Sequence, residues 1–195
     1  MNIATKVTPN IIATKDVSLE DKYVSDNGTA YMTGIQALVR LPLAQTRRDA
    51  MNGYHTAGFI SGYRGSPVGN YDSFLWQVQG LLKSHNVVFQ PGVNEDLAAT
   101  AIWGTQQVNL SGQGKYDGVS SWWYGKGPGV DRSGDVLRHA NLAGTSERGG
   151  VVALFGDDHS CKSSTIPHQS EHVMIGCGIP IFYPTSVQQI LDFGV

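Results

Sequence analysis

Residues 87–104 read VVFQPGVNEDLAATAIWG, and within them a strand pattern changes into a helix pattern. An apolar, β-favouring run over residues 87–89 ends at the Pro-Gly pair at 91–92, which breaks regular structure. Two carboxylates follow, Glu95 and Asp96, and then a segment made mostly of small residues. A strand that leads directly into a helix is the unit from which parallel α/β sheets are built.

The same alternation runs through most of the chain. Apolar segments typical of buried strands are separated by segments with helical spacing. This pattern favours a three-layer α/β fold, with a mainly parallel sheet of five or six strands and helices on both faces. The segments expected to be strands are residues 56–63, 86–91, 116–125, 149–158 and 179–184. The segments expected to be helices are residues 29–51, with a kink or break at Pro42, then 70–85, 94–109, 130–144 and 167–176, with a further helix starting at 186.

The composition limits the classes of function. The chain has 195 residues, enough for one domain with a real core. Its 14 Lys and Arg against 16 Asp and Glu give a net charge of −2, so there is no electrostatic case for binding nucleic acid or an anionic membrane. Cys161 and Cys177 form no C-x-x-C pair, and residues 1–27 form a polar arm without a signal-peptide pattern. We therefore expect a cytoplasmic protein without a membrane span.

Functional residues of a parallel sheet gather in the loops at the carboxyl ends of its strands. Residues 62–69 and 125–129 are rich in glycine, but their spacing matches neither a Walker A loop nor G-x-G-x-x-G. A phosphate cradle and an ordinary strand-to-helix turn both remain open for them. Asp157 and Asp158 fit either the start of a magnesium site or a helix cap or turn.

His168, Glu171 and His172 spell H-x-x-E-H, the inverted zinc-protease motif. On a helix, the two histidines would share one face and bind zinc while Glu171 acts as the general base. A zinc hydrolase is therefore one alternative. The other interpretation is a polar helix start, with Pro167 near the first turn.

Glu95 and Asp96 have a simple structural explanation, because negative side chains suit the N-terminus of a helix. That explanation does not account for the small residues over 98–101, which let another surface approach the helix closely. A carboxylate at a strand end, beside a helix without bulk, suits a flat ring packed against it.

Four blocks follow one another in the chain: GFISGYRGSP, FQPGVNEDLAATAIWG, WYGKGPGVDRSGDVLRHANLAGTS and GDDHSCKSSTIPHQSEH. In this order they closely resemble the N-terminal part of the large indolepyruvate ferredoxin oxidoreductase family, whose members are thiamine-diphosphate-dependent 2-oxoacid oxidoreductases. The resemblance covers residues 28–195. It implies that these residues form a pyrimidine-binding (Pyr-type) thiamine diphosphate domain, as a fragment of a much longer enzyme.

The resemblance also implies roles for individual residues. Glu95 matches the catalytic glutamate that such domains set against the aminopyrimidine ring. A carboxyl group bonded to ring N1′ favours the imino tautomer of the 4′-amine, which then removes the C2 proton, and the small residues would leave room for the ring. Arg64 and His139 are the implied substrate-binding residues, Arg64 because a guanidinium can hold a carboxylate at two points. The implied cofactor-binding residues are Gly62, Tyr63, Gly65, Ser66, Pro67, Asn94 and Glu95.

The chain has neither the G-D-G…N pattern that binds diphosphate and magnesium nor the clustered cysteines of iron–sulfur sites. The resemblance therefore assigns no metal ligand to this chain. It places magnesium on a diphosphate-binding domain, in cis or in trans, and iron–sulfur clusters elsewhere in the full enzyme.

The activity implied for the full enzyme is oxidative decarboxylation of an aryl 2-oxoacid such as indolepyruvate. Coenzyme A would accept the acyl group and ferredoxin the electrons. We expect that enzyme to be a homo-oligomer and this fragment to be inactive alone. The alternative is a non-catalytic Pyr-like module that supports assembly or regulation of a partner.

Overall fold

Four strands pair in parallel in the order β2-β1-β3-β4 in the computed structural model, which describes residues 18–195. β1 and β3 lie in the middle of the sheet and are almost entirely buried, because both of their faces are covered. The chain passes from β1 to β2 on one side and then to β3 on the other. The carboxyl ends of β1 and β3 therefore flank a topological switch point, where ligands commonly bind. The strand bounds are β1 Ala57–Gly62, β2 Val87–Phe89, β3 Val119–Lys126 and β4 Gly150–Gly156.

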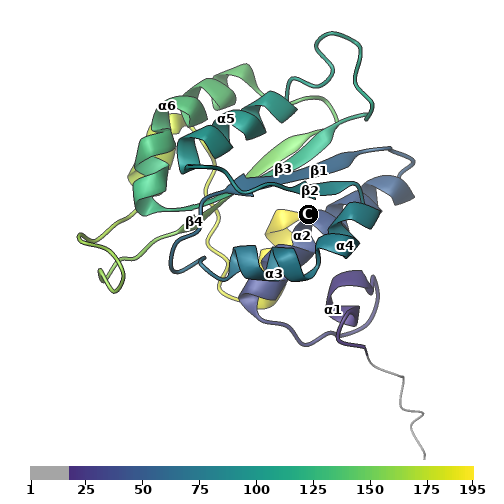
Figure 1. Cartoon of the computed structure of the whole chain (residues 1–195), viewed down its shortest axis with the longest axis horizontal. Coiled ribbons are helices and arrows are strands. Elements are labelled where there is room, and N and C mark those ends of the chain that lie inside the picture. The colour runs from purple at the N-terminus through teal and green to yellow at the C-terminus, as the bar shows by residue number, and fades with distance from the viewer. Residues whose placement is uncertain (1–17) are drawn as a thin grey trace, which may run out of the picture.

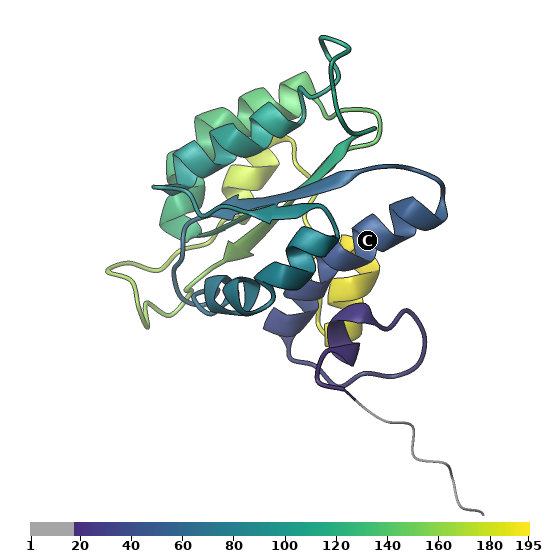
Figure 2. The ribbon, with the colours of Figure 1, turned by 45° about the vertical axis from the view of Figure 1, so that its right-hand side comes forward.

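Helices cover both faces of the sheet, which gives three layers (Figures 1 and 2). This arrangement confirms the expected three-layer α/β fold with a parallel sheet. No helix within residues 18–195 combines the length and the apolar character that a membrane crossing requires. One face carries α5 (Glu95–Thr105), α6 (Gly127–Ala143) and α7 (Glu171–Cys177). The other carries α2 (Gly34–Met51), α3 (Tyr71–Gln77), α4 (Gln79–Ser84) and α8 (Val187–Gly194), with α1 (Asp21–Val24) against α2.

β3 contributes side chains to the apolar cores on both faces of the sheet, because alternate side chains of a strand point to opposite sides. Trp122 and Tyr124 pack with apolar residues of α2, α3 and α4, whereas Trp123 packs with those of α5, α6 and α7. All three side chains are fully buried. Three large aromatic residues thus fix β3 between the two helical layers, and with it the strand end that borders the predicted site.

Residues 18–27 of the expected polar arm pack against α2. The Arg40 guanidinium donates to two backbone carbonyls of this segment at 2.8 and 2.6 Å. Arg47 Nη1 donates to the carbonyl of Tyr23 at 3.0 Å, and the Tyr23 side chain is buried. The rest of the expected arm, residues 1–17, lies outside the described residues. The domain boundary at residue 28 stays a prediction.

Residues 179–184 do not form the expected fifth strand. The described part of the chain has four strands, and β4 is an edge strand of that sheet. Pro180 and Pro184 lack the amide N–H that a strand donates to its neighbour, so this apolar segment is poorly suited to pairing. The predictions of a strand here and of five or six strands are both wrong for residues 18–195.

A kink or break was expected at Pro42, and the break does not occur, because helix α2 continues through this residue. Proline cannot donate to the carbonyl four residues earlier, which belongs to Leu38. The hydroxyl of Tyr71 donates to that carbonyl instead, at 3.5 Å. The expected helix over residues 70–85 is divided at Val78 into α3 and α4.

Candidate functional site at the carboxyl ends of the strands

Glu95 is the first residue of α5, directly after the turn that follows β2. The Asn94 side chain caps the helix by accepting a hydrogen bond from the N–H of Leu97 at 2.8 Å. The indole Nε1 of Trp123 donates to the backbone carbonyl of Glu95 at 3.0 Å. Both contacts fix the backbone, while the half-buried carboxylate has no hydrogen bond to any described residue. The carboxylate is therefore free to meet a ligand.

The start of α6 lies against the Glu95 side chain. A Cβ placed on Gly129 would lie 2.3 Å from Glu95 Cγ and 2.8 Å from its Cδ and Oε1. No side chain fits in that space, so only glycine allows Glu95 this position. Helix α6 begins at Gly127, earlier than the expected start at residue 130, and this additional first turn is the part that reaches Glu95.

Main-chain hydrogen bonds join the turn before Glu95 to the end of β1. The Gln90 N–H donates to the Ile60 carbonyl at 3.0 Å, and the Gly92 N–H donates to the Gly62 carbonyl at 2.9 Å. These bonds extend the parallel β1–β2 pairing past the last residue of β2. Gly62 and Glu95 are far apart in sequence but lie at the same edge of the sheet.

The predicted cofactor loop, residues 62–67, crosses the carboxyl ends of β3 and β4. A Cβ on Gly62 would lie 2.1 Å from the Tyr124 carbonyl oxygen, and the N–H of Tyr63 donates to the same oxygen at 3.1 Å. At the other end of the loop, a Cβ placed on Gly156, the last residue of β4, would lie 3.0 Å from Pro67 Cδ. The fold thus brings this loop, Asn94 and Glu95 to one edge of the sheet. The exposed residues of the loop are Tyr63, Arg64, Ser66 and Pro67, and Gly65 is half-buried.

A buried carboxyl group lies on the α3 side of this loop and was not singled out from the sequence. Asp72 is 9% exposed, and its Oδ1 has no hydrogen-bond partner among the described residues. The buried hydroxyl of Tyr124 is likewise without a partner there. Burial raises the pKa of Asp72, and the neighbouring Tyr124 hydroxyl and the positive charge of Arg64 partly offset this shift. Burial, and then the charge of Asp72, raise the pKa of Tyr124. In the sequence, Asp72 looks like an ordinary acidic residue in the first turn of a helix.

The small residues of α5 serve helix packing. Ala98 and Ala99 are 1% and 4% exposed and belong to the core formed with α6 and Trp123. Small side chains let α5 approach its neighbours closely. Thr100 and Ala101 are exposed to solvent. The interpretation that Ala98 and Ala99 leave room for a flat ring is therefore wrong.

His139 lies toward the far end of α6 and away from Glu95. At 1.5 Å per residue, it is about 15 Å along the helix from Gly129. Its Nδ1 is 2.9 Å from the Asp135 carbonyl oxygen, and its ring centroid is 6.1 Å from that of Trp103. The structure does not bring His139 together with the other predicted site residues.

The loop after β4 uses its first two carboxylates to hold itself together. Asp158 accepts hydrogen bonds from the N–H groups of Lys162 and Ser163 at 2.9 and 2.7 Å. The Ser163 N–H is the main cause that lowers the pKa of Asp158 to about 2. Asp157 accepts from the N–H and the Oγ of Ser170 at 2.6 and 2.7 Å. For Asp158, these contacts favour the turn interpretation of the Gly-Asp-Asp sequence.

The H-x-x-E-H motif does not form a helical zinc site. Helix α7 begins at Glu171, so His168 precedes the helix and cannot share a helical face with His172. The His168 ring lies against Gly127, with Nε2 3.5 Å from Asp131 Oδ2, whereas His172 is exposed. The zinc-hydrolase interpretation of this motif is therefore wrong.

An apolar cavity of about 400 Å³ surrounds the open edge of β4. Besides β4, its walls come mainly from α5, α6, α8 and residues 179–184. Neither Glu95 nor any residue of the 62–67 loop lines it. The apolar cavity and the predicted site are separate places.

Two curated relatives are similar to this chain over 136 residues. Indolepyruvate oxidoreductase subunit IorA from Methanothermobacter thermautotrophicus is 26% identical, and the subunit of the same name from Methanothermobacter marburgensis is 25% identical. Each match covers 70% of this chain and 20% of the relative, so the chain spans about a fifth of the length of the curated relatives it matches. No protein-family model and no solved structure matches the chain. The similarity agrees with the resemblance to indolepyruvate oxidoreductases and does not assign the matched region to a particular domain.

Proposed function

We propose that this chain supplies the aminopyrimidine-binding part of a thiamine-diphosphate-dependent 2-oxoacid oxidoreductase. The observation that carries the proposal is the position of Glu95 at the start of α5. Its backbone is held by Asn94 and Trp123, and its carboxylate has no hydrogen bond to any described residue. The two relatives named indolepyruvate oxidoreductase subunit support the same class of reaction.

The residues at this edge fit the aminopyrimidine ring of the cofactor. Such a ring needs a carboxyl group that can share a proton with a ring nitrogen, and Glu95 offers one that no described residue engages by a hydrogen bond. Gly129 allows the side chain to stay where it is. Asn94 is engaged in the helix cap, so its role is to set the direction of Glu95. The loop over residues 62–67, in which four side chains are exposed, borders the same edge of the sheet.

The residues of this chain would have two chemical roles, to share a proton with the cofactor and to bind the carboxylate of the 2-oxoacid. Thiamine diphosphate, when bound, supplies a carbon nucleophile and an electron sink for decarboxylation. Glu95 would hold a proton between its carboxyl group and ring N1′, which makes the exocyclic amine a better base. Arg64, on the exposed loop, would bind the carboxylate of the 2-oxoacid.

The complete enzyme would contain parts that this chain does not show. A diphosphate-binding domain, in cis or in trans, would hold magnesium, and iron–sulfur clusters elsewhere would carry electrons to ferredoxin. The substrate would be an aryl 2-oxoacid such as indolepyruvate, with coenzyme A accepting the acyl group as carbon dioxide leaves. Because the thiamine site is completed between two domains, a homo-oligomer is the expected assembly.

Ferredoxin reduction by a complete protein that carries this segment tests the proposal. We expect indolepyruvate and coenzyme A to drive reduction only when thiamine diphosphate and magnesium are present. Reduction that does not depend on thiamine diphosphate would contradict the proposal. A complete protein that neither reduces ferredoxin nor binds thiamine diphosphate would support the non-catalytic module instead.

The isolated 195-residue chain offers a second test by calorimetric titration with thiamine diphosphate and magnesium. We expect weak binding or none, because the diphosphate half of the site is missing. Tight, magnesium-dependent binding to a monomer of this chain would contradict the proposed division of the site between two domains.

A further inference from the structure

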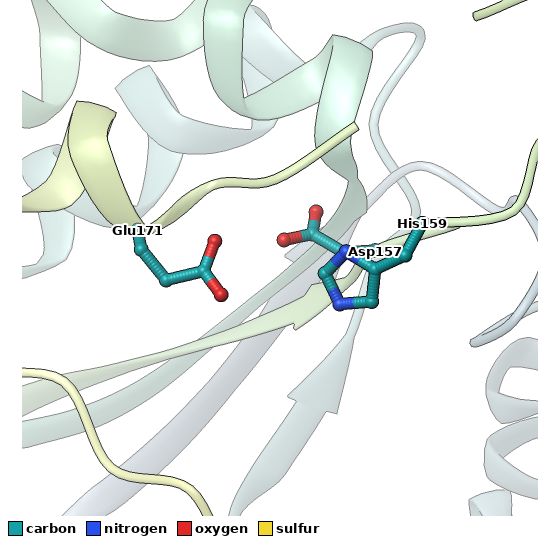
Figure 3. A group of neighbouring side chains, drawn as sticks. All are labelled: Asp157, His159 and Glu171. Atoms are coloured by element: carbon teal, nitrogen blue, oxygen red, sulfur yellow. The ribbon is translucent and has the colours of Figure 1, made fainter. Parts of the chain in front are cut away.

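Asp157, His159 and Glu171 bring three metal-binding side chains together beside α7 (Figure 3). Asp157 directly follows β4, His159 lies further along the same loop, and Glu171 is the first residue of α7. One potential ligand atom from each side chain lies within 4.8 Å of the other two. We infer that these three side chains bind a divalent transition-metal ion of the Zn²⁺ type.

The Asp157 carboxylate is already oriented by the protein. The Ser170 N–H donates to Oδ2 at 2.6 Å, and the Ser170 Oγ donates to Oδ1 at 2.7 Å. An ionised carboxylate has about four lone-pair positions, so these two bonds leave room for a cation. Carboxylates fixed by hydrogen bonds in this way are typical metal ligands in proteins.

A contact at one nitrogen of the His159 ring leaves the other nitrogen available to bind a metal ion. Its Nδ1 is 2.9 Å from the backbone carbonyl oxygen of His168. A carbonyl oxygen only accepts hydrogen bonds, so Nδ1 is the donor, and in the neutral ring Nε2 has a free lone pair for a metal ion. Metal-binding histidines almost always donate their second ring N–H to such a group. In Figure 3 the carboxylate of Asp157 lies between that of Glu171 and the imidazole of His159.

Glu171 contributes a buried carboxylate oxygen to this group of side chains. Its Oε2 is buried and has no hydrogen-bond partner among the described residues. A buried acceptor without a partner is unfavourable, and a bound cation would satisfy it.

The donor set favours Zn²⁺ or a similar ion over Mg²⁺ and Ca²⁺. One imidazole nitrogen and two carboxylate oxygens suit zinc, whereas magnesium and calcium prefer oxygen ligands alone. Zinc bonds of about 2.0–2.2 Å put tetrahedral ligands roughly 3.3 Å apart, so the side chains would close slightly around the ion. His159 is exposed and Glu171 is long and flexible, which makes such a rotation feasible. Three protein ligands leave a position for water or a further ligand.

This site differs from the H-x-x-E-H motif and does not depend on the proposed thiamine chemistry. Glu171 is a ligand here and not a base. His168 takes part only through its backbone carbonyl, and His172 takes no part. Because two ligands come from the loop after β4 and one from α7, a bound ion would join these two segments.

Calorimetric titration of the 195-residue chain with ZnCl₂ tests the inference. We expect one Zn²⁺ per wild-type chain, and affinities at least about tenfold lower for His159→Ala and for Glu171→Gln. The matched control is His172→Ala, which removes the exposed histidine next to Glu171 and should bind Zn²⁺ within about twofold of wild type.

Three results would overturn the inference. They are a wild-type chain that binds no Zn²⁺, a His159→Ala chain that binds as tightly as wild type, and an equal loss in His172→Ala. Far-UV circular dichroism checks that each variant is folded. If His159→Ala does not fold, Glu171→Gln decides the matter, because glutamine keeps the size of the side chain and removes the charged ligand.

Discussion

The turn before α5 and the loop before α7 leave the same edge of the sheet but use their carboxylates differently. The turn, residues 90–94, is held by main-chain hydrogen bonds to β1 and by the Asn94 cap, and it leaves Glu95 without a hydrogen-bond partner. The loop, residues 157–170, is held largely by two aspartate side chains at its start. The Glu95 carboxylate is left without a partner because main-chain bonds and the Asn94 cap hold its turn, whereas Asp158 is fully engaged in holding its loop.

Replacing Glu95 by glutamine should have the largest effect. Glutamine keeps the size and can still form hydrogen bonds, but it cannot exchange a proton with ring N1′. Positioned acid–base groups contribute about 10²–10⁴-fold, or about 3–5 kcal/mol of barrier. We expect a loss of that order in the rate of ferredoxin reduction by the complete enzyme, with little change in Tm. Asp96→Asn, one residue along, should cost less than about tenfold, and equal losses would assign the effect to general charge at the helix end.

Gly129→Ala tests whether the close approach of α6 sets the position of Glu95. The new Cβ would meet the Glu95 side chain, which can rotate away, so the fold should survive while the carboxylate moves. Misplacing a catalytic group by about 1 Å can cost about 10²-fold in rate.

The control for this change is Gly134→Ala on the same helix, where a Cβ would contact nothing within 4 Å. It should keep full activity and add up to about 1 kcal/mol of stability, because alanine favours helix. Equal activity of the two variants in the ferredoxin assay would show that Gly129 does not position Glu95.

Asp158→Asn should weaken the loop before α7 in a pH-dependent way. The pKa of Asp158 is lowered from 3.8 to about 2 by the N–H of Ser163, so its contribution to folding is fully present above about pH 4 and is lost as the pH falls through 2. The Tm of the variant should therefore lie below that of wild type at pH 6, and the difference should shrink toward pH 2.5. A Tm difference that stays constant across this range would mean that the negative charge of Asp158 does not hold the loop.

His139→Ala should have the smallest effect. The side chain is exposed and lies far along α6 from Glu95, so we expect a change in stability within about 0.5 kcal/mol and little change in the KM for the 2-oxoacid. A large rise in KM would show that His139 reaches the substrate in the assembled enzyme, as the resemblance implies.

The strands could be predicted from the sequence because strands buried on both faces are apolar throughout and end in glycine-rich loops. The same pattern failed at residues 179–184, since strand pairing also needs N–H donors, which Pro180 and Pro184 lack. Helix α2 is not broken at Pro42, and the carbonyl that proline leaves free accepts a long hydrogen bond, 3.5 Å, from the hydroxyl of Tyr71, which is distant in sequence. Such long-range compensation has no local sequence signal.

Only the features of the candidate site that depend on residues adjacent in the sequence could be predicted. The Asn94 cap and the position of Glu95 after a strand are both readable from the order of residues. The contact between Gly129 and Glu95 and the grouping of Asp157 and His159 with Glu171 depend on how separate segments pack. A Gly-Pro-Gly sequence at the start of a helix was the available signal for the close approach of α6.

Deuterium exchange at C2 of bound thiamine diphosphate tests the central claim most directly, because it measures the proton transfer assigned to Glu95 apart from later steps. The measurement uses the complete enzyme with saturating cofactor and compares Glu95→Gln with Asp96→Asn. We predict that exchange slows by about 10²–10⁴-fold in Glu95→Gln and stays near the wild-type rate in Asp96→Asn. Exchange at the wild-type rate in Glu95→Gln, together with a severe loss in Asp96→Asn, would assign the role to Asp96 and contradict the account.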